Sequence, residues 1–80
     1  MSSITVYTKS SCQQCVQTKR VLDKEGLEYS EVNIEDDMDA RQYVTGDLGY
    51  VQAPVVVAGD EHWAGFRPQR IKDLARLVAS

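Results

Sequence analysis

The feature that most constrains this chain is a pair of cysteines that directly follows a short β-branched run. Ile4–Thr8 has the composition of a strand, and residues 9–11 form a polar connection from it to Cys12. From Cys12 to about Glu25 helix-favouring residues dominate, and Gly26 is a natural stop. We therefore expect a strand, a tight connection and a helix whose first turn carries both sulfurs of a Cys-x-x-Cys segment.

The next segments alternate between helix and strand patterns. In the first helix we expect apolar bulk on the side of Val16, Lys19, Val21 and Leu22. Glu28–Ile34 predicts a second strand, because Tyr29, Val32 and Ile34 stand among polar residues. Asp36 or Asp37 can cap a second helix that buries Ala40, Tyr43 and Val44 and ends at Gly46 or Gly49.

The last third predicts a hairpin and a helix. Pro54–Ala58 is continuously apolar, the pattern of a strand that is covered on both faces. Residues 59–61 predict a turn into a short edge strand around His62–Ala64. Pro68 is well placed to begin a helix with a buried face made of Ile71, Leu74, Ala75 and Val78.

This order of elements, βαβαββα, predicts one α/β domain over residues 1–80. The βαβ unit requires a parallel strand pair with a right-handed crossover, and the last two strands form an antiparallel hairpin. The expected architecture is a mixed four-stranded sheet with three helices distributed over both faces.

Charge and hydropathy argue against several function classes. The net charge is −3 and no basic stripe with interleaved aromatics occurs, so nucleic acid is a poor candidate partner. The longest apolar run, Ala53–Ala58, is far shorter than the ~20 residues that a membrane helix needs. No basic stretch precedes a long apolar one near the N-terminus, so we expect a cytoplasmic protein without a signal peptide.

The two cysteines, Cys12 and Cys15, favour redox chemistry over structural stapling. A bridge across two intervening residues restrains little of the unfolded chain. At a helix N-terminus the Cys12 thiolate is stabilised by unpaired N–H groups and the helix dipole, which suits it to be the nucleophile. Cys15 lies behind it as the resolving thiol. Gln13 and Gln14 are uncharged, so Lys9 is the side chain expected to favour the thiolate, with Tyr7 packed beside it.

Two other interpretations of the cysteines remain open at this point. Cys-x-x-Cys is also half of a zinc site, but tetrahedral zinc needs four ligands, and the chain offers only His62 besides acidic groups. We expect His62 to be a surface residue and the protein to hold no metal. The second alternative is a purely structural cysteine pair, which placement at a strand-to-helix junction disfavours.

Three segments together resemble a known family along essentially the whole chain. They are Tyr7-Thr8-Lys9 before the cysteines, Gln52-Ala53-Pro54-Val55-Val56, and His62-Trp63-Ala64-Gly65-Phe66-Arg67-Pro68. They are similar to the NrdH-type redoxins, which are glutaredoxin-like in sequence and thioredoxin-like in behaviour. The resemblance implies a thioredoxin fold, no bound cofactor, electron delivery to the class Ib ribonucleotide reductase and re-reduction by the NADPH-dependent flavoprotein thioredoxin reductase.

The resemblance also implies roles for particular residues. Pro54 matches the family's cis-proline, and the Ala53–Pro54 bond is expected to lie against the cysteines; the alternative is an ordinary trans proline. Trp63 and Phe66 are expected to form an apolar docking patch, which Arg67 anchors through hydrogen bonds. The alternative is that Phe66 fills the core and Arg67 packs the turn.

The chain departs from the family pattern at two positions beside the cysteines. Ser11 replaces a common proline and Gln13 a small apolar residue, and both can tune the redox potential. The glycine-rich turn with an aspartate, by which true glutaredoxins hold the glutathione amine, is replaced by Gly65-Phe66-Arg67-Pro68. We therefore expect glutathione to be a poor reductant. A monomer is expected, because the reactive end must meet two partners in turn.

Overall fold

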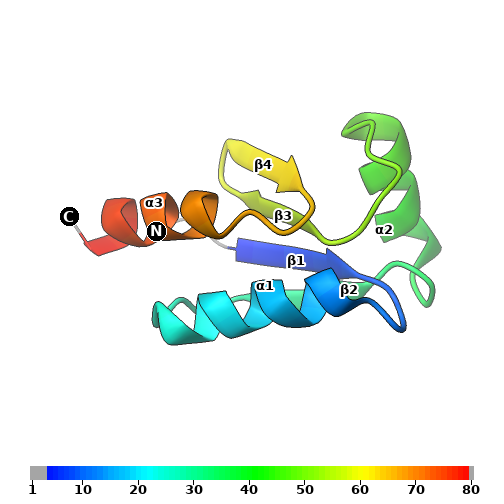
Figure 1. Cartoon of the computed structure of the whole chain (residues 1–80). Helices are drawn as coiled ribbons and strands as arrows, with labels where there is room; N and C mark the ends of the chain where they lie inside the picture. The colour runs from blue at the N-terminus through cyan, green and yellow to red at the C-terminus, as the bar shows by residue number, and fades with distance from the viewer. Residues whose placement is uncertain (1–3, 80) are drawn as a thin grey trace.

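The computed structural model describes residues 4–79, which form a four-stranded sheet with helices on both faces (Figure 1). The elements in chain order are β1 (Ile4–Thr8), α1 (Gln13–Lys24), β2 (Ser30–Asn33), α2 (Met38–Gln42), η1 (Tyr43–Asp47), β3 (Val55–Ala58), β4 (Glu61–Ala64) and α3 (Pro68–Ala79). The order in the sheet is β2-β1-β3-β4. β1 pairs with β2 in parallel and with β3 antiparallel, and β3 and β4 form an antiparallel hairpin. The predicted thioredoxin-type architecture is confirmed.

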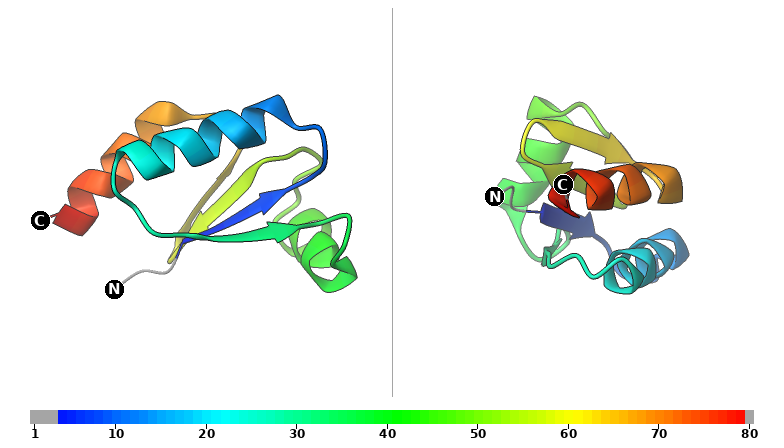
Figure 2. Two further views of the ribbon diagram at one scale, coloured as in Figure 1. Left: turned by 90° about the horizontal axis from the view of Figure 1, so that it is seen from below. Right: turned by 90° about the vertical axis from the view of Figure 1, so that its left-hand side faces the viewer.

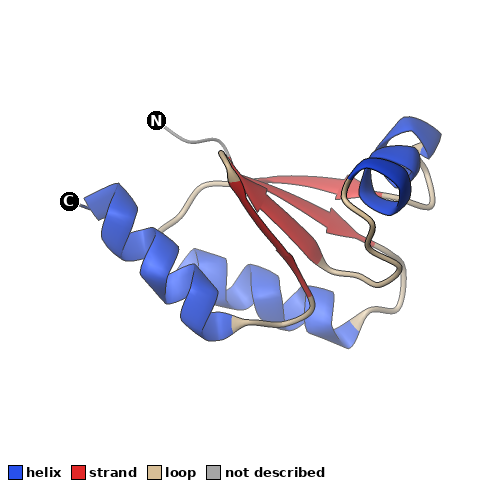
Figure 3. Ribbon diagram, turned by 90° about the horizontal axis from the view of Figure 1, so that it is seen from above, coloured by secondary structure: helices blue, strands red, loops and turns tan. Residues whose placement is uncertain are grey.

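The alternating side chains of the strands build a separate apolar cluster on each face of the sheet. On one face Val6 and Val56 pack with Leu22 of α1 and Ile71 of α3. On the other face Val55 and Ala64 pack with Val44 of η1, in a smaller cluster. Accordingly α1 and α3 lie together on one face of the sheet, while α2 and η1 cover the opposite face (Figures 2 and 3). The β1–α1 loop lies at one end of the molecule and the end of α3 lies at the other (Figure 1).

The buried face of α1 differs from the predicted one. Cys15, Thr18 and Leu22 are buried, whereas Val16 is 40% exposed. Side chains at i, i+3 and i+7 share a helix face, and this face includes the second cysteine. The prediction was right for Leu22 and for Val21, which packs against the core, and wrong for Val16, because it started from the first aliphatic residue of the helix. A buried Cys15 was already compatible with the sequence, since cysteine is among the most buried residue types.

The second helical segment begins as predicted but ends differently. Asp37 is its N-cap, with Oδ1 accepting a hydrogen bond from the Ala40 N–H at 3.0 Å. The segment then widens into the π-helical turn η1, which no sequence pattern indicated. Gly46 lies inside this turn, and the chain leaves it through Leu48 and Gly49.

Two boundaries and one buried position were also wrong. β2 is shorter than the predicted Glu28–Ile34, and Pro54 precedes β3 instead of opening it. α3 begins at Pro68 as expected and buries Ile71 and Leu74. Val78, however, is 55% exposed, and the last turns of α3 extend beyond the strands (Figure 1).

Candidate active site

Cys12 and Cys15 form a disulfide at the N-terminus of α1, with their Cα atoms 5.2 Å apart. Cys12 is the N-cap of the helix, and its Sγ accepts a hydrogen bond from the Cys15 N–H at 3.1 Å. Cys12 is half-buried, whereas Cys15 is only 2% exposed. The first sulfur is therefore the accessible one, and a backbone donor already points at the position where its negative charge develops on reduction.

The loop before Cys12 has an unusual backbone conformation. Ser11 has a φ of 57°, in the left-handed region, which most side chains avoid. A proline at this position could not adopt that angle, because its ring fixes φ near −65°.

The loop before Cys12 is also tied to the segment after β2. The Ser10 N–H donates to Glu35 Oε1 at 2.7 Å. This hydrogen bond lowers the pKa of Glu35, and the positive charges of Lys9 and Arg41 contribute.

A cavity of about 440 Å³ lies beside the disulfide. Its lining residues come from β1, the β1–α1 loop, α1 and β2, and they are Thr8, Lys9, Ser11, Cys12, Gln13, Cys15, Val16, Lys19 and Glu31. Lys9 and Gln13 thus line the same cavity as Cys12, and their influence on its thiolate remains a prediction. Both side chains are exposed.

This cavity contains a polar network that no sequence pattern indicated. Lys19 Nζ lies 3.2 and 3.0 Å from the two carboxylate oxygens of Glu31. Glu31 Oε2 also accepts a hydrogen bond from Thr8 Oγ1 at 3.0 Å, and Thr8 is 2% exposed. Lys19 and then Thr8 lower the pKa of Glu31, against the opposing effect of burial. The strand register, which places Glu31 opposite Val6, could not be read from a single sequence.

Gln14 connects the cysteine turn to a distant loop. Its Oε1 accepts a hydrogen bond from the Phe66 N–H at 3.3 Å. The next residue back, Gly65, donates its N–H to the carbonyl of Pro54 at 2.8 Å. The Ala53–Pro54 peptide bond is cis, the geometry that the resemblance implied. These hydrogen bonds hold the loop after β4 between the Cys-x-x-Cys turn and Pro54.

Trp63 is not part of an exposed docking patch, and this prediction was wrong. The indole is 5% exposed and belongs to the larger apolar cluster. Trp63 points to the face that α3 covers, and the Arg70 guanidinium lies 5.0 Å from the ring centre. The indole can be buried on this edge strand because α3 covers it. The sequence of the strand by itself does not indicate this covering helix.

The two other residues of the predicted patch remain accessible. Phe66 is half-buried and Arg67 is exposed. Arg67 Nε donates to the Ala64 carbonyl at 3.0 Å, a hydrogen bond that fixes the turn between β4 and α3. The role of both residues in docking remains a prediction.

Tyr7 packs on the face of the sheet opposite to α1. Its ring centre lies 5.9 Å from that of Tyr43 in η1. Burial, with the nearby Tyr43 and Asp37, raises the pKa of Tyr7. Tyr7 does not line the cavity beside the disulfide, because neighbouring strand residues point to opposite faces and Thr8 lines that cavity instead. The support of the cysteines by Tyr7 remains a prediction.

The remaining candidates lie away from the disulfide. His62 is exposed on β4, where its Nδ1 is 2.8 Å from the hydroxyl of Tyr50. Among the residues that the structure describes, no group of three or more His, Cys, Asp and Glu side chains could hold a metal ion. Within residues 4–79 no helix is both long and apolar enough to span a membrane.

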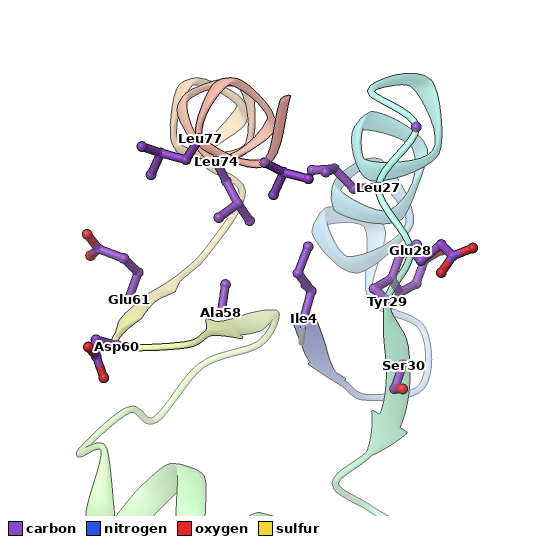
Figure 4. Close-up of a pocket in the computed structure, with 12 residues that line it drawn as sticks. Ile4, Leu27, Glu28, Tyr29, Ser30, Ala58, Asp60, Glu61, Leu74 and Leu77 are labelled. Carbon is purple, nitrogen blue, oxygen red and sulfur yellow. The ribbon is translucent and has the colours of Figure 1, made fainter. Parts of the chain in front are cut away.

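Two further hollows lie on the surface of the described residues. One of about 360 Å³ lies on the other side of Lys9, between Arg41, Tyr50 and Ala53. The other, about 1020 Å³, lies beneath α3 at the other end of the sheet from the cysteines, with the side chains of Ile4 and Leu74 extending into it (Figure 4). This hollow is therefore separate from the redox site.

The fold and the disulfide together define a glutaredoxin-like thiol–disulfide redox protein. The sequence pattern of the glutaredoxin family matches residues 4–63. The glutaredoxin-like protein NrdH of Salmonella typhimurium is 44% identical over 72 residues, 90% of this chain and 88% of the relative. The NrdH protein of Lactococcus lactis subsp. cremoris is 33% identical over 90% of this chain and 99% of the relative. The chain belongs to the glutaredoxin-like NrdH family.

A solved structure of the same family has the same fold. The NrdH-redoxin of Escherichia coli, described as a glutaredoxin-like protein with a thioredoxin-like activity profile, superposes with a TM-score of 0.85. The two sequences are 39% identical, and the match covers 90% of this chain and 93% of the other.

Proposed function

We propose that this protein is a cytoplasmic electron carrier that reduces a disulfide of the class Ib ribonucleotide reductase and is itself reduced by thioredoxin reductase. The observation that carries the proposal is the accessible, helix-capping Cys12 with the buried Cys15 directly behind it. Membership of the NrdH family supports the choice of partners. The single domain is expected to act as a monomer without a bound cofactor.

The proposed cycle uses the two thiols in sequence. The Cys12 thiolate attacks a partner disulfide, forms a mixed disulfide and releases one partner sulfur as a thiolate. The Cys15 thiolate then attacks Cys12 Sγ, which releases the second partner sulfur and forms the Cys12–Cys15 disulfide. Two electrons pass to the partner, and thioredoxin reductase returns two electrons from NADPH through its flavin.

The surface around Cys12 supports docking of an extended partner segment. Phe66 presents a half-buried aromatic ring on the loop that Gln14 and Pro54 hold in place. Arg67 secures the turn behind it. Since the aspartate-bearing glutathione turn is replaced in this chain, glutathione is expected to reduce the disulfide poorly.

A coupled assay tests the partners. NADPH oxidation is followed with thioredoxin reductase, this protein and a class Ib ribonucleotide reductase, and omission of this protein should stop turnover. Equal turnover with glutathione and glutathione reductase would contradict the assignment of the reductant.

Two serine variants test the roles of the cysteines. Cys15→Ser should trap a covalent complex with the ribonucleotide reductase, because the mixed disulfide at Cys12 cannot be resolved. Cys12→Ser should trap none. Trapping only by Cys12→Ser would exchange the two roles.

A further inference from the structure

Cys15 lies in an environment that by itself disfavours its reactive form. Cys15 is 2% exposed, and burial disfavours a thiolate. The backbone N–H of Cys15 is already donated to Cys12 Sγ. The resolving step needs Cys15 as a thiolate, and a nearby positive charge offsets part of the cost of burial.

Lys19 is placed to supply this charge. It lies four residues after Cys15 on α1, the spacing that brings two side chains to the same helix face. Lys19 and Cys15 line the same 440 Å³ cavity. The Lys19 side chain is only 28% exposed, which limits screening of its charge by solvent.

The ammonium is also held in position. Both carboxylate oxygens of Glu31 lie within 3.2 Å of Lys19 Nζ, and the buried Thr8 hydroxyl fixes one of them. This arrangement ties a flexible side chain of α1 to β2 across the cavity. We propose that the Lys19 ammonium, anchored by Glu31, stabilises the thiolate of Cys15 while that sulfur resolves the mixed disulfide.

The other charged groups around the cavity either favour or oppose a thiolate at Cys15. Lys9 is a second cation, on the exposed loop before Cys12. Glu31 is an anion and by its charge opposes a thiolate, so its part is to anchor Lys19. Tyr29, beside Glu31, has a pKa raised by burial and by the charges of Asp23 and Glu31, and it stays neutral at pH 7.

The experiment separates the two thiol steps without any protein partner. The reduced protein is mixed in stopped flow with slightly less than one equivalent of Ellman's aromatic disulfide. Attack by Cys12 releases one coloured aromatic thiolate and leaves the second aryl sulfur on Cys12. Attack by Cys15 on Cys12 Sγ then releases the second thiolate and forms the intramolecular disulfide. The second phase does not depend on concentration and reports Cys15 alone.

The Lys19→Gln variant should change only the second phase. We expect its pH midpoint to rise by about one unit, the lower end of the effect of a neighbouring opposite charge. Below the midpoint the thiolate fraction falls about tenfold, but a more basic thiolate is about threefold more nucleophilic, so the second phase slows about threefold. Above the midpoint the variant should be faster than the wild type. Lys19→Arg, which keeps the charge, should restore the wild-type profile.

Two further variants distinguish charge from mere tethering. Glu31→Gln breaks the same ion pair but leaves the Lys19 cation in place. The amide oxygen of the new side chain can still accept a hydrogen bond from Lys19. The second phase of this variant should therefore be as fast as that of the wild type or faster. Lys24→Gln, in the last turn of the same helix, is the control for general loss of positive charge and should change neither phase. Equal slowing by Lys19→Gln and Glu31→Gln would overturn the proposal and leave only a structural tether.

This inference rests on the proposed function, and the two can fail separately. If the wild-type protein shows no second phase, Cys15 does not resolve and the carrier function fails. If the wild type shows both phases and the Lys19→Gln profile is unchanged, only the proposed role of Lys19 is refuted. Thermal unfolding of each variant shows whether it is folded. If Lys19→Gln does not fold, Lys19→Arg and Glu31→Gln still test the proposal, because a slower second phase in either variant would contradict it.

Discussion

The side-chain oxygen of Gln14 accepts a hydrogen bond from the backbone N–H of Phe66, which is 52 residues away in the sequence. Gln14 lies between the two cysteines, and Phe66 lies on the loop that joins β4 to α3. Because Gly65 on the same loop donates to the Pro54 carbonyl, the loop is held from both sides. The position of Gly65 and Phe66 beside the cysteine turn is therefore fixed by hydrogen bonds to Gln14 and Pro54, which no local sequence pattern reveals.

We expect Gln14→Ala to loosen this loop without altering the cysteines. The hydrogen bond is solvent-exposed and 3.3 Å long, so its loss should cost about 0.5 kcal/mol of stability, at the low end for such bonds. The more specific result is faster hydrogen exchange of the Phe66 amide, measured by NMR. Gln13→Ala is the matched control, since the Gln13 side chain is exposed and forms no hydrogen bond with the described residues. Equal exchange rates in both variants would contradict the role given to Gln14.

Gly65 and Gly46 should respond to alanine in opposite directions. Gly65 has a φ of 86°, so Gly65→Ala should destabilise the protein by about 1–2 kcal/mol, the cost of a left-handed alanine. An added Cβ would lie 3.8 Å from Gln14 Oε1, an ordinary contact, so backbone strain is the only penalty. Gly46 lies in η1 with nothing within 4 Å of an added Cβ, and Gly46→Ala should stabilise by about 0.5–1 kcal/mol. Urea unfolding of both variants checks the two signs.

Most elements of this fold could be predicted because they carry a local signal. The bounds of Ile4–Thr8 were predicted correctly, because the segment is rich in β-branched residues and a polar connection follows it. Asp37 and Pro68 mark helix starts through chemistry that acts within one turn. The π-helical turn at residues 43–47 has no comparable signature, and the sequence pattern suggested an ordinary helix there.

Residues of the candidate site could be predicted only where neighbours along the chain define them. The Cys12–Cys15 pair is such a case, since its spacing and position imply the disulfide. Trp63 and Glu31 depend on what packs against them from distant segments: α3 buries the first, and the parallel β1–β2 register brings the second to Lys19. Such contacts can be found only in the folded structure.

Leu22 and Val16 test which face of α1 is buried. Leu22 is 0% exposed, so Leu22→Ala should cost about 2–5 kcal/mol through lost apolar burial and the cavity left behind. Val16 is 40% exposed, so Val16→Ala should cost less than about 1 kcal/mol. Denaturant midpoints of the oxidised proteins measure both. A larger loss in Val16→Ala would show that the helix is rotated from the orientation described.

Glu31 should make the stability of the protein depend on pH in the acid range. Its pKa is lowered in the folded protein below its ordinary value of 4.5, chiefly by the Lys19 hydrogen bond. The stabilisation is therefore complete above the unfolded pKa and is lost as the pH falls through the folded one. The Glu31 side chain is 42% exposed, so the effect should be that of a surface pair, about 0.2–1 kcal/mol.

Urea unfolding of the wild type and of Glu31→Gln between pH 7 and about 3 measures this contribution. The two proteins should differ most at pH 7 and converge in acid. Added salt should narrow the difference at pH 7, because an exposed pair is screened. A difference that stays constant with pH would mean that the charge of Glu31 does not contribute.

Phe66 should matter for partner docking and not for thiol chemistry. Phe66→Ser keeps the backbone N–H that Gln14 accepts, so the loop should hold its position while the half-buried ring is lost. We expect KM for thioredoxin reductase to rise about tenfold, the effect of losing one aromatic contact in an interface. The rate with a small aromatic disulfide should be unchanged, since that reaction needs no docked surface. Met38→Ser, which removes an apolar side chain that is 75% exposed on α2, is the control and should leave both constants unchanged. If Phe66→Ser slows the small disulfide as much as the reductase, the ring supports the cysteines and not the partner.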